Sequence, residues 1–136
     1  ESTIIDCTGA APSVLRPGAI SVAMIEECTG LKTTGSDKEI RVSGSLENHY
    51  APVAKVLLRE NVIAGQGFIA HSSIQTPPGV IRLAAPNNDE EFARLLYSAL
   101  RDADTQGLVE VVVMQPIGIG IAVAIRDRLA RAANGR

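Results

Sequence analysis

The sequence predicts an α/β fold in which a small open sheet is flanked by helices. Residues 108–114, LVEVVVM, are almost all apolar, which is typical of a central strand buried on both faces. Residues 54–58, 67–71 and 79–84 are short, apolar and bounded by turn residues, so we expect three more strands there. A helical pattern lies on each side of 108–114, and this order of helix, buried strand and helix indicates an open sheet.

Both helices are predicted from the periodicity of their apolar residues. Asn88 and Glu91 have capping-box spacing, and apolar residues then recur at helical intervals until Gly107. The second helix is expected over residues 120–133, with apolar residues along one face. Residues 59–66 are too few for a crossover helix, so we expect none between the first two strands of this stretch.

The amino-terminal stretch is predicted to form two strands and one short helix. Residues 2–8 and 13–16 are rich in apolar and β-branched residues. Ser21 is suited to cap a helix over residues 22–28, which would end at Gly30. A unit this small cannot bury its own apolar faces. We therefore expect it to pack more weakly than the remainder and to need a partner sheet.

Composition divides the chain into three regions. Residues 31–50 are polar and rich in Gly and Ser, and strand-like sequence resumes after residue 52. We predict the strand-strand-helix end of an α/β domain at residues 1–30, a linker at 31–52 and an α/β domain at 53–136. Because the sequence opens directly on strand-like residues, we expect it to be a piece of a longer polypeptide.

The bulk composition restricts the classes of function. Apolar residues make up 46% of the chain and aromatic residues 3%, so a stacking platform for nucleic-acid bases is not expected. The formal net charge of −2 gives no overall attraction to RNA. Cys7 and Cys28 form no disulfide framework, and no signal peptide or long apolar run is present. We expect a cytoplasmic location without membrane attachment.

Two local features favour structural interpretations. His71 ends a strand and has no neighbours at metal-ligand spacing, so we expect a surface or interface histidine and no metal site. Gly118 and Gly120 resemble the start of a dinucleotide fingerprint, but Val123 stands where the third glycine is needed. A tight strand-to-helix turn is the preferred interpretation, and a weak anion site at the helix start is the alternative.

Arginines gather near the carboxyl terminus, where Asp127 interrupts them. We expect solvated side chains that complement the helix dipole, and direct contact with RNA is the alternative. The residues concerned are Arg126, Arg128, Arg131 and Arg136.

Three stretches together resemble one family. ESTIIDCTG (1–9) with VLRPGAIS (14–21) is similar to the closing hairpin of the YrdC-like L-threonylcarbamoyladenylate synthases. NHYAP (48–52) resembles the HYAP linker motif of the two-domain members. The tail, from EEFARLLYSALRDAD to IAVAIRDRLARAA, resembles their Rossmann-like accessory domain. The order of these motifs identifies the chain as the carboxy-terminal portion of such an enzyme.

The resemblance implies a reaction. The family joins L-threonine, bicarbonate and ATP, the last expected with Mg²⁺, to give L-threonylcarbamoyl-AMP and pyrophosphate. A downstream transferase complex then modifies the adenosine at position 37 of tRNA. Carbamate must attack the α-phosphate while pyrophosphate leaves, so the reaction needs a positively lined site.

The resemblance also implies roles for four residues. Ser2 matches the serine that contacts L-threonine, and Arg16 matches the arginine of an Arg-Pro-Gly motif that contacts the nucleotide phosphates. A guanidinium suits phosphate because its planar fork binds two oxygens and stays protonated. His49 and Tyr50 match the lid segment, in which Tyr50 touches ATP and helps to exclude water. No catalytic residue is assigned.

One departure from the family pattern limits what this chain can do. The family's Lys-x-Arg and Ser-x-Asn motifs, which bind the substrates, occur nowhere in the sequence. We therefore expect the amino-terminal catalytic half to be missing, the isolated chain to be inactive, and its role to be closing or regulating the site. The alternative from another class is that residues 53–136 form an independent module that binds a small ligand, RNA or a partner protein.

Overall fold

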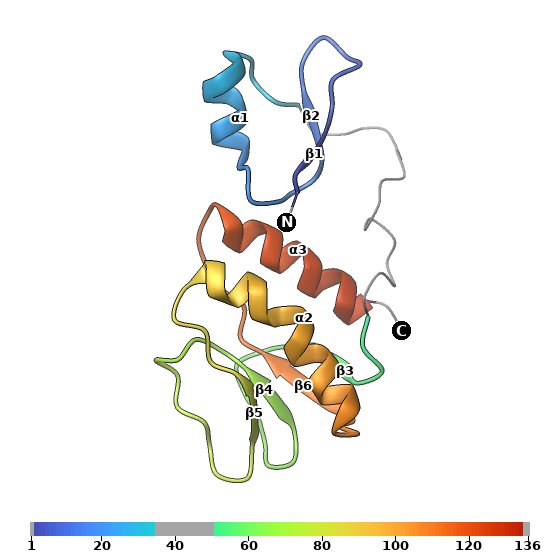
Figure 1. Cartoon of the computed structure of the whole chain (residues 1–136), viewed down its shortest axis with the longest axis vertical. Helices are drawn as coiled ribbons and strands as arrows, with labels where there is room; N and C mark the ends of the chain where they lie inside the picture. Colours follow the sequence, from blue (N-terminus) through green and yellow to red (C-terminus); the bar gives the residue numbers. More distant parts are fainter. Residues whose placement is uncertain (1, 35–50, 135–136) are drawn as a thin grey trace.

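The computed structural model describes residues 2–34 and 51–134. These two ranges form two parts that lie one above the other in Figure 1. The hairpin part, residues 2–34, contains two strands and a helix. The sheet part, residues 51–134, contains four strands and two helices. In Figure 1, α3 (Ile121–Asn134) lies between the hairpin part and the sheet. The predicted α/β class is confirmed.

The hairpin part is held together by antiparallel pairing and by the caps of its helix. β1 (Ile4–Asp6) pairs with β2 (Ser13–Arg16), and Ile4 is the register partner of Arg16. α1 (Val22–Thr29) begins after Ser21, whose hydroxyl accepts a hydrogen bond from the Met24 N–H. The helix ends at Gly30, which has a φ of +69°. The predicted cap and stop of this helix are confirmed, whereas the first strand is shorter than expected.

Few residues of the hairpin part are buried. Within residues 2–34, burial is complete or nearly so at Pro12, Gly18 and Ile25. None of these residues belongs to the two hydrophobic core clusters of the described chain, which lie wholly in the sheet part. This matches the expectation that so small a unit packs weakly.

The sheet part is built on four parallel strands in the order β3-β6-β4-β5. β6 (Glu110–Val113) lies inside the sheet, and Val111, Val112 and Val113 have no exposed surface. The predicted central position of this strand is confirmed. The other strands are β3 (Lys55–Leu58), β4 (Gly67–Ile69) and β5 (Ile81–Ala84).

Both long helices cover the same face of the sheet. α2 (Asp89–Thr105) and α3 contribute Phe92, Leu96, Ile125 and Leu129 to one core cluster with Val111 and Val113 of β6. The Asn88 side chain accepts from the Glu91 N–H, as predicted. The Glu91 carboxylate reaches Asn87 rather than Asn88, and this hydrogen bond to the Asn87 N–H lowers the pKa of Glu91.

The opposite face of the sheet is covered by connecting segments and by one arginine. Residues 59–66 carry no helix, as expected from their length. The Arg82 guanidinium lies 4.9 Å from the ring centroid of Phe68, a buried residue of this face. Each of its three nitrogens donates to an oxygen of the surrounding backbone or to Thr76; the carbonyls are those of Ala70, His71, Ile74 and Ala84. Arg82 therefore closes a face that carries no described helix.

We expect Arg82→Met to lower the free energy of unfolding by about 2–4 kcal/mol, because it leaves several carbonyls without their donor. Chemical denaturation of the chain measures this change. Arg94→Met is the matched control, because Arg94 is exposed on α2, and its effect should stay within about 0.5 kcal/mol. Equal effects of the two substitutions would contradict the role assigned to Arg82.

Candidate functional site

Two of the residues singled out in the sequence, Ser2 and Arg16, lie in direct contact. One terminal nitrogen of Arg16 donates to the Ser2 hydroxyl at 2.9 Å and to the Ser2 carbonyl at 3.1 Å. The residues are 14 positions apart, and the pairing of Ile4 with Arg16 carries Ser2 to the end of the hairpin where this guanidinium lies. Antiparallel register therefore brings a hydroxyl and a guanidinium together.

Gly18 allows this arrangement by a close approach of two backbones. A Cβ at position 18 would lie 2.4 Å from the Thr3 nitrogen and 2.5 Å from the Ser2 carbonyl carbon, distances that real side chains do not reach. Thr3 is held from the other side, because its hydroxyl donates to the Ile20 carbonyl at 2.7 Å. The glycine that follows Arg16 and Pro17 thus positions Ser2.

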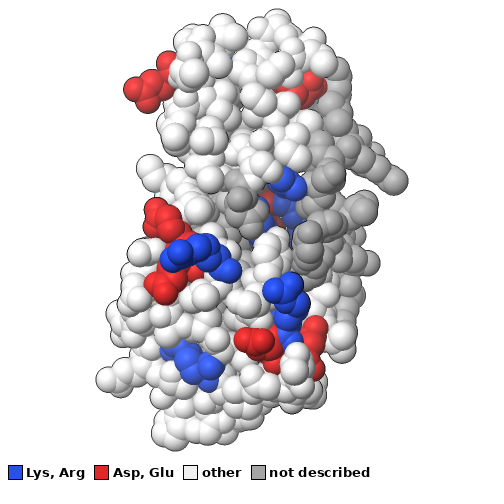
Figure 2. All heavy atoms as spheres, in the orientation of Figure 1, with Lys and Arg blue, Asp and Glu red and all other residues white. Residues whose placement is uncertain are grey.

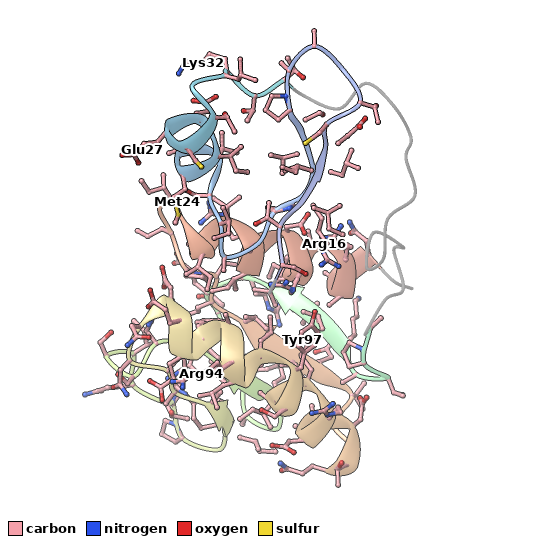
Figure 3. All side chains as sticks on the ribbon, turned by 45° about the horizontal axis from the view of Figure 1, so that its top comes forward. Arg16, Met24, Glu27, Lys32, Arg94 and Tyr97 are labelled. Atoms are coloured by element: carbon pink, nitrogen blue, oxygen red, sulfur yellow. The ribbon has the colours of Figure 1, made fainter. Side chains whose placement is uncertain are left out.

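Arg16 lies beside α3, on the side away from the sheet (Figure 3). Its charge is close enough to act on Arg131, a residue of α3 whose pKa is lowered first by burial and then by Arg16. Tyr97 of α2 is also close enough to act on Arg131. Figure 2 shows Lys or Arg side chains set into the recess between the hairpin part and the sheet part.

Arg131 has a carboxylate partner on its own helix. It forms an ion pair with Asp127, one turn earlier, and the side chains are 19% and 28% exposed, respectively. Arg128 is also partly buried, and burial lowers the pKa of its guanidinium. Arg126 donates to the Pro116 and Gly118 carbonyls at 2.9 and 2.8 Å. These three side chains are only partly exposed, so the expectation of solvated arginines is met in part. Arg136 lies outside the described residues.

The described end of the linker is anchored to α2. The Asp104 carboxylate accepts from the Val53 N–H at 3.0 Å and from the Ala54 N–H at 2.9 Å. Pro52 is buried, and a cavity of about 150 Å³ lies between residues 51–52 and α2, where Tyr97 lines it. His49 and Tyr50 lie outside the described residues, but the chain that follows them is fixed beside Tyr97.

A larger apolar cavity lies between the hairpin part and the start of α3. Its volume is about 390 Å³, and Gly120 and Val123 line it on the α3 side. Gly118 and Gly120 have φ of +106° and +70°, so they form the tight strand-to-helix turn that was predicted. On the hairpin side the lining includes Val14, Pro17, Ile20 and Val22.

His71 lies apart from this recess, at the carboxyl end of β4. Its Nε2 is 3.2 Å from an Asp89 oxygen, and its ring meets that of Phe92 edge to face. Within residues 2–34 and 51–134, no three His, Cys, Asp or Glu residues are arranged to hold a metal ion. No helix in the same two ranges is both long and apolar enough to cross a membrane.

A family model described as "Threonylcarbamoyl-AMP synthase, C-terminal domain" matches residues 20–134. The chain belongs to this family. The resemblance drawn from the hairpin, the linker motif and the last two helices is therefore confirmed, including the inference that the chain is the carboxy-terminal portion.

Relatives of known name extend the match to the whole chain. A threonylcarbamoyl-AMP synthase of Pyrococcus abyssi is 30% identical and covers 96% of this chain, which spans 45% of that protein. One of Bacillus subtilis is 27% identical and covers all of it, corresponding to 46% of its own length. The chain thus spans about half the length of the curated relatives it matches.

Solved structures give the same picture. The crystal structure of Pyrococcus abyssi Sua5 complexed with L-threonine matches all of this chain with a TM-score of 0.78 and 28% identity, over 46% of its own length. A variant of the same protein, in which a histidine and a tyrosine are replaced by alanine, matches with a TM-score of 0.76 and 25% identity, over 45% of its length.

Sequence reasoning did not single out Asp104 or Tyr97, and it named Asp127 and Arg131 only as members of the arginine cluster, not as an ion pair. Asp104 acts on residues 50 and 51 positions away, which no local pattern reveals. Asp127 and Arg131 are four positions apart, which is the spacing of an ion pair on one helix face. This spacing could have predicted the pair, but it does not indicate which side of the helix meets the hairpin part.

Gly18→Ala should displace the strand at Ser2 and Thr3 and lower the free energy of unfolding by about 1–3 kcal/mol, since a methyl group has no room there. Faster hydrogen exchange at residues 2–6 and a lower melting temperature would register the displacement. Gly9→Ala is the control: its Cβ meets only the Ala11 carbonyl, at 3.6 Å, so it should change little. Identical behaviour of the two variants would refute the positioning role.

Asp104→Ala should release the linker end from α2, because Val53 and Ala54 lose their acceptor. Their amides should exchange roughly tenfold to a hundredfold faster, as expected for hydrogen bonds to a charged group. Asp102→Ala is closely matched, since both carboxylates lie in the last turn of α2 and both oppose its dipole. Similar exchange at residues 53–54 in both variants would show that Asp104 is no anchor.

Proposed function

We propose that this chain completes an L-threonylcarbamoyladenylate synthase, which makes L-threonylcarbamoyl-AMP and pyrophosphate from L-threonine, bicarbonate and ATP. The observation that carries the proposal is the contact between Ser2 and Arg16, two residues matched separately to the family's threonine and phosphate contacts. Family membership and the L-threonine complex of the Pyrococcus abyssi relative support it.

In this proposal, Ser2 and Arg16 bind the two reacting partners side by side. The Ser2 hydroxyl contacts L-threonine, and the Arg16 guanidinium contacts the ATP phosphates. Two or more N–H groups of one guanidinium can serve different acceptors, so Arg16 can keep Ser2 in place while it binds a phosphate oxygen. Holding carbamate and α-phosphate in one orientation lowers the entropic part of the barrier.

The charge on Arg16 matters for the second half of the reaction. Pyrophosphate carries away negative charge when the bond to the α-phosphate breaks, and a fixed cation stabilises that charge as it develops. Mg²⁺ bound to ATP would share this role in the complete enzyme. The groups that assist bond formation belong to the half of the enzyme carrying the Lys-x-Arg and Ser-x-Asn motifs.

The linker is proposed to act as the lid. Tyr50 would cover the nucleotide and His49 would help to place it, which excludes water from a mixed anhydride that hydrolyses readily. The anchoring of residues 53–54 by Asp104 supports this role, because it fixes one end of the lid beside α2. The only adjacent His-Tyr pair in this sequence is His49-Tyr50. A structure of the Pyrococcus relative has such a pair replaced by alanine.

The remaining elements of the proposal concern the complete protein. Its product would pass to the transferase complex that modifies adenosine in tRNA, in the cytoplasm, and direct contact of this chain with RNA is not required. The position of Arg16 beside α3 supports an integrated role for the sheet part over an independent binding module, since a helix of the sheet part borders the proposed phosphate ligand (Figure 3).

Arg16→Ala in the complete enzyme should reduce ATP affinity or the rate of synthesis about tenfold to a hundredfold, because a charge-assisted contact to phosphate is lost. Arg16→Lys should recover part of the loss, since it keeps the charge but not the planar fork. Threonine-dependent pyrophosphate release and thermal unfolding are measured together. Unchanged kinetics with a marked drop in melting temperature would make Arg16 a structural residue.

A further inference from the structure

We propose that Ile117 and Ile119, on the loop between β6 and α3, dock on the amino-terminal half of the complete enzyme. The occupant of this surface is therefore the half that carries the Lys-x-Arg and Ser-x-Asn motifs. The contact would join the sheet part to that half at a second place, apart from the linker. The inference goes beyond the proposed function, because it rests on membership in the family and not on the reaction.

The first argument is the exposure of two apolar side chains on one short loop. Ile117 is 90% exposed and Ile119 is 91% exposed. Among the large apolar side chains of residues 2–34 and 51–134, these are the two highest values. A single exposed apolar side chain is ordinary, whereas adjoining ones form a patch of the kind that marks a binding surface.

The apolar surface continues from the loop onto the hairpin part. Ile119 lines the cavity of about 390 Å³ together with Ile20 and Val22, which are also exposed. Figure 1 shows the end of α3 to which this loop leads next to α1. The two parts of the chain thus present one joint apolar surface, which a single partner can cover.

The loop is held in the conformation that exposes these side chains. One terminal nitrogen of Arg126 donates to the Pro116 carbonyl at 2.9 Å, and the other donates to the Gly118 carbonyl at 2.8 Å. Gly118 has a φ of +106°, which side chains with a Cβ rarely adopt. The fold therefore fixes the backbone around Ile117 and Ile119, and their exposure does not result from a loose loop.

The composition of this surface indicates the chemistry of its partner. Most of the cavity lining comes from residues 17–25 and 115–125, and neither stretch contains a charged residue. Glu26 is the charged residue among those that line the cavity. RNA and nucleotides are bound through cations, which this surface does not offer. An uncharged apolar surface is suited to the apolar core of a protein interface.

The amino-terminal half is the protein surface that belongs here. The chain spans 45% and 46% of two relatives, and its family model is that of a C-terminal domain, so these relatives have a large amino-terminal region besides the matched one. Gly18 lines the cavity, and a Cβ on it would lie 2.5 Å from the Ser2 carbonyl carbon. The amino-terminal half is joined to the chain just before Ser2, which is beside this cavity.

Photo-crosslinking in the complete enzyme identifies the occupant. Ile119 is replaced by photo-leucine, a diazirine amino acid of similar size, and the crosslinked peptides are identified by mass spectrometry. We expect crosslinks to the amino-terminal half. Val109 is the control, replaced in the same way, because it is 81% exposed at the opposite end of β6 and lines none of this cavity. It should give far fewer crosslinks.

The other possible occupants give different products. Crosslinks from position 119 to residues 14–26 alone would show that the cavity closes within this chain, which overturns the inference. Crosslinks between two copies, or a yield no higher than at position 109, would overturn it as well. Thermal unfolding of both variants verifies that each is folded.

The rate of thiol labelling provides a second measurement. Ile119→Cys and Val109→Cys are compared in the complete enzyme after the exposed residues Cys7 and Cys28 are replaced by serine. Maleimide should label position 119 about tenfold more slowly than position 109, since a covered thiol is less accessible. Equal rates would contradict the docking of this loop.

The failure of the proposed function looks different. A complete enzyme that made no threonylcarbamoyl-AMP but gave the expected crosslinks would leave the interface standing and the reaction wrong. An enzyme that made the product without these crosslinks would leave the reaction standing and the interface wrong.

Discussion

The burial of β6 determines how the rest of this chain is arranged. Val111, Val112 and Val113 are fully enclosed, with neighbouring strands on both sides and side chains directed to both faces of the sheet. α2 precedes this strand and α3 follows it, and both return to the same face. The side of α3 that does not meet the sheet is therefore turned to the hairpin part. The recess around Arg16 exists because β6 places α3 there.

The joint between the two parts is not a continuous hydrophobic core. Residues 2–34 share no core cluster with the sheet part, and a cavity of about 390 Å³ lies between them. Little hydrophobic burial therefore opposes a change in their relative position.

The sequence was sufficient for the elements and for part of the site. Periodicity and caps locate α1, α2 and α3 within one or two residues, because the local signals at Ser21, Gly30 and Asn88 act within a single turn. Ser2 and Arg16 were found separately, from two stretches that resemble the closing hairpin of the family. Register then explains why they meet, since both lie at the same end of the β1-β2 hairpin. The lid residues His49 and Tyr50 stay predictions.

What the sequence could not supply are contacts that depend on tertiary neighbours. Arg82 is an ordinary strand residue until the folded chain surrounds it with carbonyls of residues 70–84, and Asp104 looks like any acidic residue near a helix end. The arginines of α3 were expected to face solvent because an amphipathic pattern shows only which face of a helix packs on the core. It cannot show that the polar side of the helix is covered as well.

The arginines of this fold differ in the groups that accept their hydrogen bonds. Arg82 and Arg126 donate to backbone carbonyls, neutral groups whose geometry is fixed by the fold, and both tie loops to the sheet part. Arg16 meets a hydroxyl and a carbonyl at the end of a hairpin, and Arg131 meets a carboxylate on its own helix. The contact of Arg16 joins residues 14 positions apart, whereas the ion pair of Arg131 stays within one helix.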